Sequence, residues 1–354
     1  MFLYEKYILS NILLLLILNC CVPFRTFADE WERIQNLQGK WKFNIGDKIQ
    51  WASPNYDDTN WEEINVPGPW ENQGFHGYDG YAWYRRTFNM SSYYKGTNLY
   101  LSLGYIDDVD EVFVNGHIIG FSGSFPPSYK TSFRSYRMYH IPEEHLNFEG
   151  NNLIAVRVYD GQIEGGIIDG EVGIFINQSD FSFDISLRGI WKFHLGDEIE
   201  WRTKNYDDAA WENIMAPSKW EHQGFFGYDG WGWYRKTFHL SKKLKGEDYY
   251  LILGKIDDYD QVFVNGRLIG NTGIDINGKV SMDDESWQKF RVYFLPQEIL
   301  QLDQYNTIAI RVYDKIGDGG IYAGPVGILK KSRYNDFKKR YSDNPDEFHY
   351  DFFR

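Results

Sequence analysis

Cysteine is almost absent from this sequence of 354 residues: the only two, Cys20 and Cys21, are adjacent and lie near the N-terminus. The rest of the chain therefore offers no thiol for a disulfide, a cysteine-zinc site or thiol catalysis. Basic residues are also in the minority, with 37 Lys and Arg against 50 Asp and Glu, which gives a net charge of -13. Because a nucleic-acid-binding protein needs a basic face to meet the phosphates, we expect no nucleic-acid partner.

Sequence signatures of cofactor and nucleophile chemistry are missing as well. There is no Walker loop, no G-x-S-x-G and no dinucleotide fingerprint, and the eight histidines are scattered without the spacing of metal ligands. We therefore predict no catalytic residue, no metal ligand and no cofactor, and leave structural calcium open as an alternative.

The N-terminus carries a short apolar run, residues 12–18, after Lys6. The run is too short to span a bilayer and is typical of a signal peptide, which we place at residues 1–28. Cleavage after residues 26–28 would release a secreted or periplasmic protein. Alternatively, a loose lipobox ending at Cys20 would leave the protein lipid-anchored at the cell envelope, which is the one membrane contact that we expect.

Aromatic residues are abundant, at 18% of the chain, and their tryptophans reveal an internal duplication. Residues 39–120 and 189–270 align without a gap, and 48 of the 82 positions are identical. After four extra residues in the second copy, residues 154–160 match residues 308–314. The repeat is too long for a solenoid unit, so each copy should be a self-sufficient domain.

Within each copy the pattern is that of β-strands. Leu99, Leu101 and Leu103 alternate with other residues, and Val-Phe-Val-Asn-Gly at 112–116 and 262–266 is a strong hairpin signal. We predict an all-β protein of two tandem antiparallel jelly-roll sandwiches. The expected boundaries are residues 34–177 for the first domain, 178–184 for the linker, 185–331 for the second domain and 332–354 for an unassigned tail.

Three stretches carry a resemblance to a known family: WYRRTF at 83–88, IDDVDEVFVNGHIIG at 106–120, and IAVRVYD at 154–160, each with its copy. They are similar to the sugar-binding, galactose-binding-like domain of family 2 glycoside hydrolases such as β-galactosidases, and to the β-sandwich domain of sialate O-acetylesterases. In those enzymes the domain precedes a large catalytic part. Two copies fill this chain and leave no room for a barrel of about 250 residues, so the family's catalytic glutamates have no counterpart here.

Repeated acids and arginines are the polar candidates for ligand binding. Alternation along a strand predicts that Asp107 and Asp108 face opposite sides and that Asp108 and Asp110 share one. Asp108 and Asp160 are also the expected ion-pair partners of the two strand arginines, Arg85 and Arg157, because a buried arginine needs a carboxylate. These residues are interpreted as an internal ion-pair network or as ligands for sugar hydroxyls or calcium. The copies are Asp258, Asp314, Arg235 and Arg311.

The glycine-rich, aromatic segment 73–80 and its copy 223–230 are predicted to be exposed loops. The stacking candidates beside them are Tyr78, Tyr81, Trp83, Tyr228, Trp231 and Trp233. The alternative for Trp83 and Trp233 is burial in the core. The loop at 120–137 differs wholly from its counterpart at 271–289, so distinct specificities are expected there, and Asp275, Asn277, Asp283 and Asp284 could hold calcium.

Three functions remain open from the sequence. The first is an exported carbohydrate-binding protein without a catalytic barrel, in which two weak sites gain from avidity. The second is a hydrolase, or the accessory chain of a β-galactosidase-like hydrolase or carbohydrate esterase whose catalytic part is encoded separately. The third is a structural or adhesion protein, in which the aromatic loops would be buried between the modules.

Overall fold

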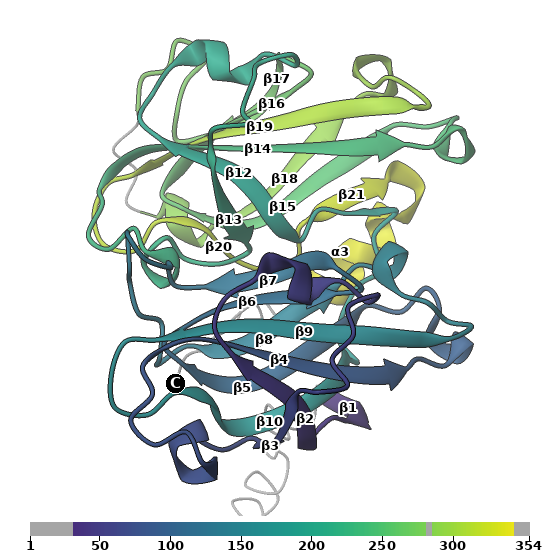
Figure 1. The fold of residues 1–354 in the computed structure, drawn as a ribbon. Helices are drawn as coiled ribbons and strands as arrows, with labels where there is room; N and C mark the ends of the chain where they lie inside the picture. The colour runs from purple at the N-terminus through teal and green to yellow at the C-terminus, as the bar shows by residue number, and fades with distance from the viewer. Residues whose placement is uncertain (1–30, 281–284, 343–354) are drawn as a thin grey trace, which may run out of the picture.

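The computed structural model describes residues 31–280 and 285–342. The predicted signal peptide, with Cys20, lies outside these residues, and so do Asp283 and Asp284. Strands dominate the described part and form two modules that stack on each other (Figure 1). The all-β prediction is confirmed. Among the described residues, no helix has the length and apolarity that crossing a bilayer requires.

The first module is an antiparallel sandwich of a six-stranded and a four-stranded sheet. The six strands lie in the order β3-β2-β4-β9-β6-β7, and the four in the order β1-β10-β5-β8. The strands are β1 (Trp31–Asn36), β2 (Gly39–Ile45), β3 (Glu62–Val66), β4 (Gly80–Asn89), β5 (Leu99–Asp107), β6 (Val109–Val114), β7 (His117–Ser122), β8 (Tyr136–Ile141), β9 (Asn151–Asp160) and β10 (Gly166–Asn177).

The second module repeats this arrangement, with sheet orders β13-β12-β14-β19-β16-β17 and β11-β21-β15-β18, and with β20 paired to β15. The strands are β11 (Ile185–Ser186), β12 (Gly189–Leu195), β13 (Glu212–Ala216), β14 (Gly230–Leu240), β15 (Tyr249–Asp257), β16 (Tyr259–Val264), β17 (Arg267–Thr272), β18 (Phe290–Leu295), β19 (Gln304–Asp314), β20 (Gly320–Ala323) and β21 (Gly327–Lys330).

Short 3₁₀ turns connect many of these strands. They lie at Ile49–Ala52, Trp70–Gln73, Ser92–Tyr94, Glu143–His145, Ile199–Arg202, Glu221–Gln223, Lys242–Leu244, Ser286–Gln288, Gln297–Ile299 and Lys331–Arg333. β1 begins three residues before the domain boundary that we predicted at residue 34.

Each sandwich encloses one large apolar core, formed by the inward side chains of both sheets. In the first module Trp41 and Tyr84 from the six-stranded sheet meet Leu101 and Leu103 from the four-stranded sheet. The second module places the copies of these residues in the same positions. Alternation along the strands therefore explains most of the core.

A smaller core covers the outer face of each six-stranded sheet. In the first module Trp51 and Trp61, from the loop between β2 and β3, pack over Trp83 of β4. As a result, residues 82–85 of β4 are buried on both faces of the sheet, and Trp83 has no exposed surface. The second module has the same arrangement around Trp233.

A glycine interrupts β5 where the strand bulges between its pairings with β8. Gly104 has φ +63°, and a Cβ on it would lie 2.0 Å from the carbonyl oxygen of Asp169. Only glycine fits both the left-handed backbone and this close approach. Gly254 has the same conformation in β15, so both modules bend this strand three residues before its acidic end.

The tail to which we assigned no role contains a helix, α3 (Tyr334–Ser342). Phe337 of α3 is buried against Ile252 and Leu329 of the second module and against Phe181 of the linker. The helix therefore covers the outer face of the smaller sheet of the second module and fastens the linker to it.

Candidate functional site

One rim of the first sandwich gathers three carboxylates. β5 ends at Asp107, β6 begins at Val109 and β9 ends at Asp160, and the pairing of Val109 with Tyr159 brings these strand ends together. One carboxylate oxygen from each of Asp107, Asp108 and Asp160 lies within 4.8 Å of the other two. We call these three residues the acidic triad.

The prediction from strand alternation is wrong for these acids. Asp108 lies in neither strand, at the point where the chain crosses from the four-stranded to the six-stranded sheet, so alternation does not apply to it. Its peptide bond to Asp107 is cis. Asp110, which we placed on the same face as Asp108, is instead fully buried and accepts a hydrogen bond of 2.7 Å from Arg137 Nε.

Hydrogen bonds hold Asp108 in the ionised form. Its carboxylate accepts from the hydroxyls of Tyr129 and Thr131 and, at 2.9 Å, from the Gly161 N–H. Burial alone would raise the pKa of Asp108, but these hydrogen bonds outweigh it and the pKa is lowered. Burial, followed by the hydrogen bond to Asp108 and its charge, raises the pKa of Asp107 to about 7.

Asp160 is the most enclosed member of the acidic triad, with no exposed surface. Its Oδ1 accepts from the Gln162 N–H, whereas its Oδ2 has no hydrogen-bond partner. Burial raises the pKa of Asp160 to about 6, and the charges of Asp108, Asp79 and Glu71 add to this effect. The rim therefore concentrates negative charge that the protein itself only partly compensates.

Aromatic rings line the approach to the acidic triad. Tyr129 and Tyr159 meet edge to face at 5.3 Å, Tyr159 meets Tyr81 at 4.8 Å, and Tyr81 stacks on Phe125 at 5.8 Å. The Arg157 guanidinium lies 4.2 Å from the Phe125 centroid and 5.0 Å from that of Tyr81. Of the four rings, that of Tyr129 has the largest exposed fraction, 38%, so it is the ring available to a ligand.

The other stacking candidates of the first module serve the fold instead. Trp83 is core, as its alternative interpretation states, and its indole N–H donates to Asp47 at 3.1 Å. Tyr78 packs against Trp70, and its hydroxyl donates to the Tyr81 carbonyl at 2.7 Å. Neither side chain forms a stacking platform next to the acidic triad.

The arginines form ion pairs, but not with the predicted partners. Arg85 binds Asp58 at 2.7 Å beneath the loop that covers the sheet. Arg157 binds Asp47 and, at 3.4 Å, Glu111. Asp108 and Asp160 are not their partners, because both arginines project from the outer face of the six-stranded sheet whereas the triad lies at its rim.

The second module repeats these ion pairs: Arg235 binds Asp208 at 2.7 Å and Arg311 binds Asp197. Trp233 is fully buried, and Tyr228 donates to the Trp231 carbonyl at 2.9 Å. These side chains match the structural roles of their first-module copies.

Trp231 keeps part of its ring accessible, but the Arg311 guanidinium lies 3.9 Å from its centroid. A sugar would have to displace this arginine to stack on that side of the ring.

An open cavity of about 370 Å³ lies beside the acids of the second module. Burial, then the hydrogen bond to Asp258 and its charge, raises the pKa of Asp257 to about 8. Burial and the charges of Asp229, Asp258 and Glu221 raise the pKa of Asp314 to about 7. The residues that line the cavity are Asp257, Asp258, Tyr259, Trp287, Lys315, Ile316 and Asp318.

Trp287, with 39% of its surface exposed, is the aromatic side chain that sequence analysis missed. It comes from the loop at 271–289, which we had singled out for its divergence. Asp275, a calcium candidate of that loop, instead closes a turn, because its Oδ1 accepts from the N–H groups of Asn277 and Lys279.

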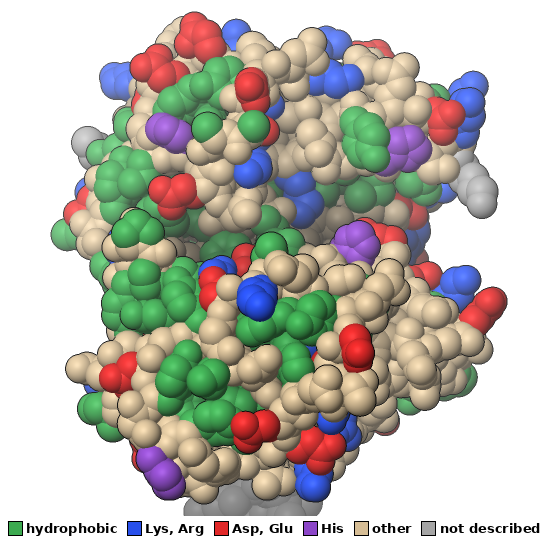
Figure 2. Space-filling model, in the orientation of Figure 1, with side chains coloured by type: hydrophobic (Ala, Val, Ile, Leu, Met, Phe, Trp, Pro, Cys, Tyr) green, Lys and Arg blue, Asp and Glu red, His purple; other side chains and the backbone are tan. Residues whose placement is uncertain are grey.

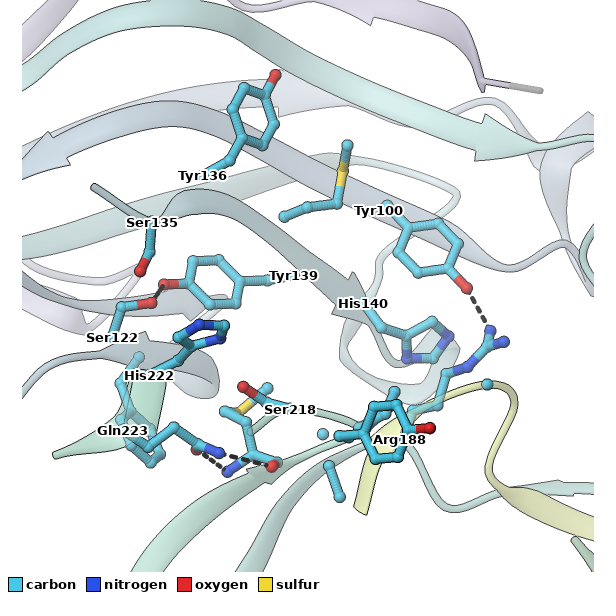
Figure 3. A pocket seen from close by; sticks show the side chains of 18 residues that line it. Tyr100, Ser122, Ser135, Tyr136, Tyr139, His140, Arg188, Ser218, His222 and Gln223 are labelled. Atoms are coloured by element: carbon cyan, nitrogen blue, oxygen red, sulfur yellow. Dashed lines mark hydrogen bonds between the residues drawn. The ribbon is translucent and has the colours of Figure 1, made fainter. Parts of the chain in front are cut away.

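A second cavity, of about 140 Å³, lies between the modules (Figure 3). Arg188 binds Asp180 at 2.6 Å and donates to Tyr100 at one side of it. Burial, followed by the charge of Arg188, lowers the pKa of His140 to about 3, so the imidazole is neutral at physiological pH. Most polar groups around this cavity thus have partners within the protein, as do Ser122 and Gln223.

Comparison with known proteins agrees with this architecture. Residues 46–162 match the model of the β-galactosidase second all-β domain. A putative β-glucuronidase of Formosa agariphila is 33% identical over 165 residues, which cover 43% of this chain and 15% of that protein. The β-galactosidase BoGH2A of Bacteroides ovatus is 30% identical over 105 residues, which cover 26% of this chain and 12% of that protein.

The chain carries β-sandwich domains of the family 2 glycoside hydrolase type. It spans only about one seventh of the length of the curated relatives that it matches. Among solved structures, a β-glucuronidase of Bacteroides uniformis matches 82% of this chain and 28% of its own at 14% identity and a TM-score of 0.35. The match to a β-glucuronidase of Lactobacillus rhamnosus covers 87% of this chain and 45% of that protein, at 14% identity and a TM-score of 0.32.

Proposed function

We propose that this protein is an exported, non-catalytic carbohydrate-binding protein whose two family 2 type sandwiches each present a sugar site at the acidic rim. The observation that carries the proposal is the open cavity of about 370 Å³ in the second module, where the exposed ring of Trp287 lies beside Asp257 and Asp258. Sugar rings stack their apolar faces on aromatic side chains, and their hydroxyls bind planar carboxylates.

The first module supports the same proposal with a smaller platform. Tyr129 is exposed at the rim and donates to Asp108, so ring and carboxylate form one preorganised pair. Hydrophobic side chains are visible on the surface of both modules, and a hollow separates the modules (Figure 2). Two weak sites on one chain would gain affinity for a polysaccharide through avidity.

The rim carboxylates favour binding over glycoside hydrolysis. A glycosidase needs two carboxyl groups about 5 to 9.5 Å apart, one on each side of the scissile bond. The oxygens of the acidic triad lie within 4.8 Å of one another, so they face the same atoms of a ligand. Tyr129 and Thr131 also donate to Asp108, which stabilises the ionised form and disfavours a general acid.

A glycan array followed by calorimetry tests the proposal. We expect saturable binding that falls at least tenfold, which is about 1.4 kcal/mol, in Trp287→Ala. The matched control is Tyr305→Ala, because Tyr305 is 66% exposed but lies at the opposite end of β19 from Asp314. Tyr129→Phe should weaken binding by the first module alone. Absence of binding to any glycan, or equal losses in Trp287→Ala and Tyr305→Ala, would reject the proposal.

An accessory role in a glycosidase is the second candidate, and the partial coverage of much longer β-glucuronidases and β-galactosidases favours it. Nitrophenyl glycosides separate the two: we expect no turnover by the protein alone. Turnover that appears only when a family 2 catalytic chain from the same genome is added would support the accessory role.

Export rests on the apolar run at residues 12–18 and on Cys20. Fractionation of the native cells tests it, with Cys20→Ser as the variant. A membrane-bound protein that Cys20→Ser releases would establish a lipid anchor, whereas a soluble product that begins at Asp29 would establish simple cleavage.

A further inference from the structure

The outer face of the smaller sheet is covered differently in the two modules. In the second module the side chains of α3 lie on this face: Tyr334 stacks on Tyr250 at 4.1 Å, and Phe337 meets Phe290 at 6.0 Å. The helix comes after β21, the last strand of that module. The last strand of the first module, β10, is followed instead by the linker at residues 178–184, which the structure describes without any helix.

The corresponding face of the first module keeps its apolar character. Tyr100 and Tyr136 are the copies of the two rings that α3 covers, at spacings of 150 and 154. Met138 packs against a small apolar cluster that contains Tyr100. Because strand residues two positions apart share a face, Tyr136, Met138 and His140 all project from the outer side of β8. This face therefore needs a cover that the first module does not supply itself.

The cavity of about 140 Å³ between the modules lies over this face (Figure 3). The first module contributes Tyr100, Met138 and His140 to its lining, and the second module contributes Met215 and Pro217. An apolar protein cavity of about 150 Å³ accommodates a benzene molecule. One aromatic ring would thus lie on the first module in the way that a ring of α3 lies on the second.

The polar groups of the lining favour an uncharged ring that carries a hydroxyl. Of the described side chains that line the cavity, Arg188 alone is ionised at neutral pH, and Asp180 compensates its charge. Burial, followed by the charge of Arg188, lowers the pKa of His140 to about 3, so the imidazole is neutral. A neutral imidazole offers one donor and one acceptor nitrogen. The contact that His140 makes within the described chain is with the ring of Tyr100, 5.4 Å away, and its nitrogens remain available to a hydroxyl.

We propose that the cavity between the modules binds an uncharged, phenol-like molecule, whose ring lies on Tyr100 and Met138 and whose hydroxyl forms a hydrogen bond with His140. In the second module the equivalent ring belongs to the chain itself, as Tyr334 stacked on the copy of Tyr100. The site shares no lining residue with the cavity beside Trp287. The inference therefore does not depend on the proposed function.

Phenol is the probe, and ligand-observed NMR with the full chain measures its binding. We expect one molecule per chain, with a dissociation constant of about 1 mM or lower. Benzoate should bind at least tenfold more weakly, because its carboxylate would be buried without a partner. Absence of saturation up to about 10 mM phenol, or equal binding of benzoate, would overturn the proposal. So would a dimer in ultracentrifugation that phenol dissociates, because a second copy of the chain would then cover this face.

Variants locate the bound phenol. Met138→Trp should fill the cavity and abolish binding. Ile49→Trp is the matched control, because it adds the same ring at a position that is 62% exposed and outside the cavity, and it should bind like the wild type.

His140→Phe introduces the residue of the second module, Phe294, and tests the hydrogen bond separately. It should weaken phenol binding about fivefold or more and leave the binding of toluene, which has no hydroxyl, unchanged. Melting curves show whether each variant is folded, and the ratio of phenol to toluene binding tests the site even where Met138→Trp does not fold. Equal effects of His140→Phe on both molecules, or unchanged phenol binding in folded Met138→Trp, would overturn the assignment.

Discussion

At the residue scale, each module depends on a buried ion pair that sequence analysis missed. Arg137 and Asp110 have no exposed surface and meet at 2.7 Å, and Arg291 and Asp260 repeat the pair in the second module. The sequence did contain an indication of it. Arg137 and Arg291 are 154 positions apart, which is the spacing that relates residues 154–160 to residues 308–314. The partner of a buried arginine depends on which strand ends meet, and one sequence does not show this.

Arg137 also fixes the candidate site, because its guanidinium donates to the Asp108 carbonyl at 3.0 Å and to that of Ser132 at 2.6 Å. Arg137→Met should reduce the free energy of unfolding of the first module by about 3 to 5 kcal/mol, since Asp110 is left buried without a partner. Urea unfolding at pH 7 measures this loss. Adding Asp110→Leu should restore part of it, and a loss below about 1 kcal/mol would contradict the role of the pair.

His140 should make the stability of the protein depend on pH. Burial, then the charge of Arg188, lowers the pKa of His140 to about 3, against about 6.5 in the unfolded chain. Between these pH values the unfolded state binds one more proton than the folded state. The contribution of His140 to the free energy of unfolding is therefore fully present above pH 6.5 and is lost as the pH falls toward 3. The slope is at most about 1.4 kcal/mol per pH unit.

The second module has Phe294 at the position of His140, so His140→Phe is the natural variant. Urea unfolding of both proteins at several pH values gives the difference, in which the carboxylates common to both cancel. We expect the free energy of unfolding of the variant to rise relative to that of the wild type as the pH falls from 6.5 to 4. Parallel pH profiles would show that His140 does not lose its proton on folding.

At the element scale, alternation predicted the sandwich core but not what covers the outer faces. Leu99, Leu101 and Leu103 are buried as their spacing indicates. Trp83 is equally buried because the loop between β2 and β3 folds over it, and the loop's tryptophans gave no indication of which strand they cover. Trp83 therefore follows the core alternative and not the stacking interpretation. Trp287 lies in a loop whose sequence differs wholly from that of its counterpart at residues 120–137, so no repeated pattern could identify it.

The helix α3 is the element whose role is easiest to test. Phe337 is 3% exposed and fills the space between the linker and the smaller sheet of the second module. Phe337→Ala should destabilise the second module by about 3 kcal/mol, the lower end for a buried phenylalanine, because the helix lies at the edge of the fold. Thermal unfolding measures the change. Lys338→Ala, one exposed residue away, is the control, and equal effects of the two variants would contradict the packing role.

At the scale of the whole molecule, the duplication predicted two domains, joined by a short linker at residues 178–184. The sequence could not predict which surfaces meet, because the contact joins a loop that differs wholly between the copies to Gly224 and Phe225, which are identical to Gly74 and Phe75 of the first copy. Lys130 of the first module reaches the Gly224 carbonyl and the ring of Phe225 in the second. The second copy of the loop that contains Lys130 has no related sequence, so the repeat gave no information here.

The interface should make the two modules unfold together. Arg188 and Asp180 are 7% and 3% exposed, and Tyr100 of the first module joins their ion pair. Arg188→Ala leaves Asp180 buried and without its cation. This should reduce the free energy of unfolding by about 3 kcal/mol or more, and the loss should weaken the contact between the modules. Calorimetry should then resolve one transition in the wild type and two in the variant. The double variant Arg188→Ala and Asp180→Ala should restore part of the stability but not the single transition, because the contact is lost in both. A single transition in every variant would mean that Lys130, the linker and α3 hold the modules together without the ion pair.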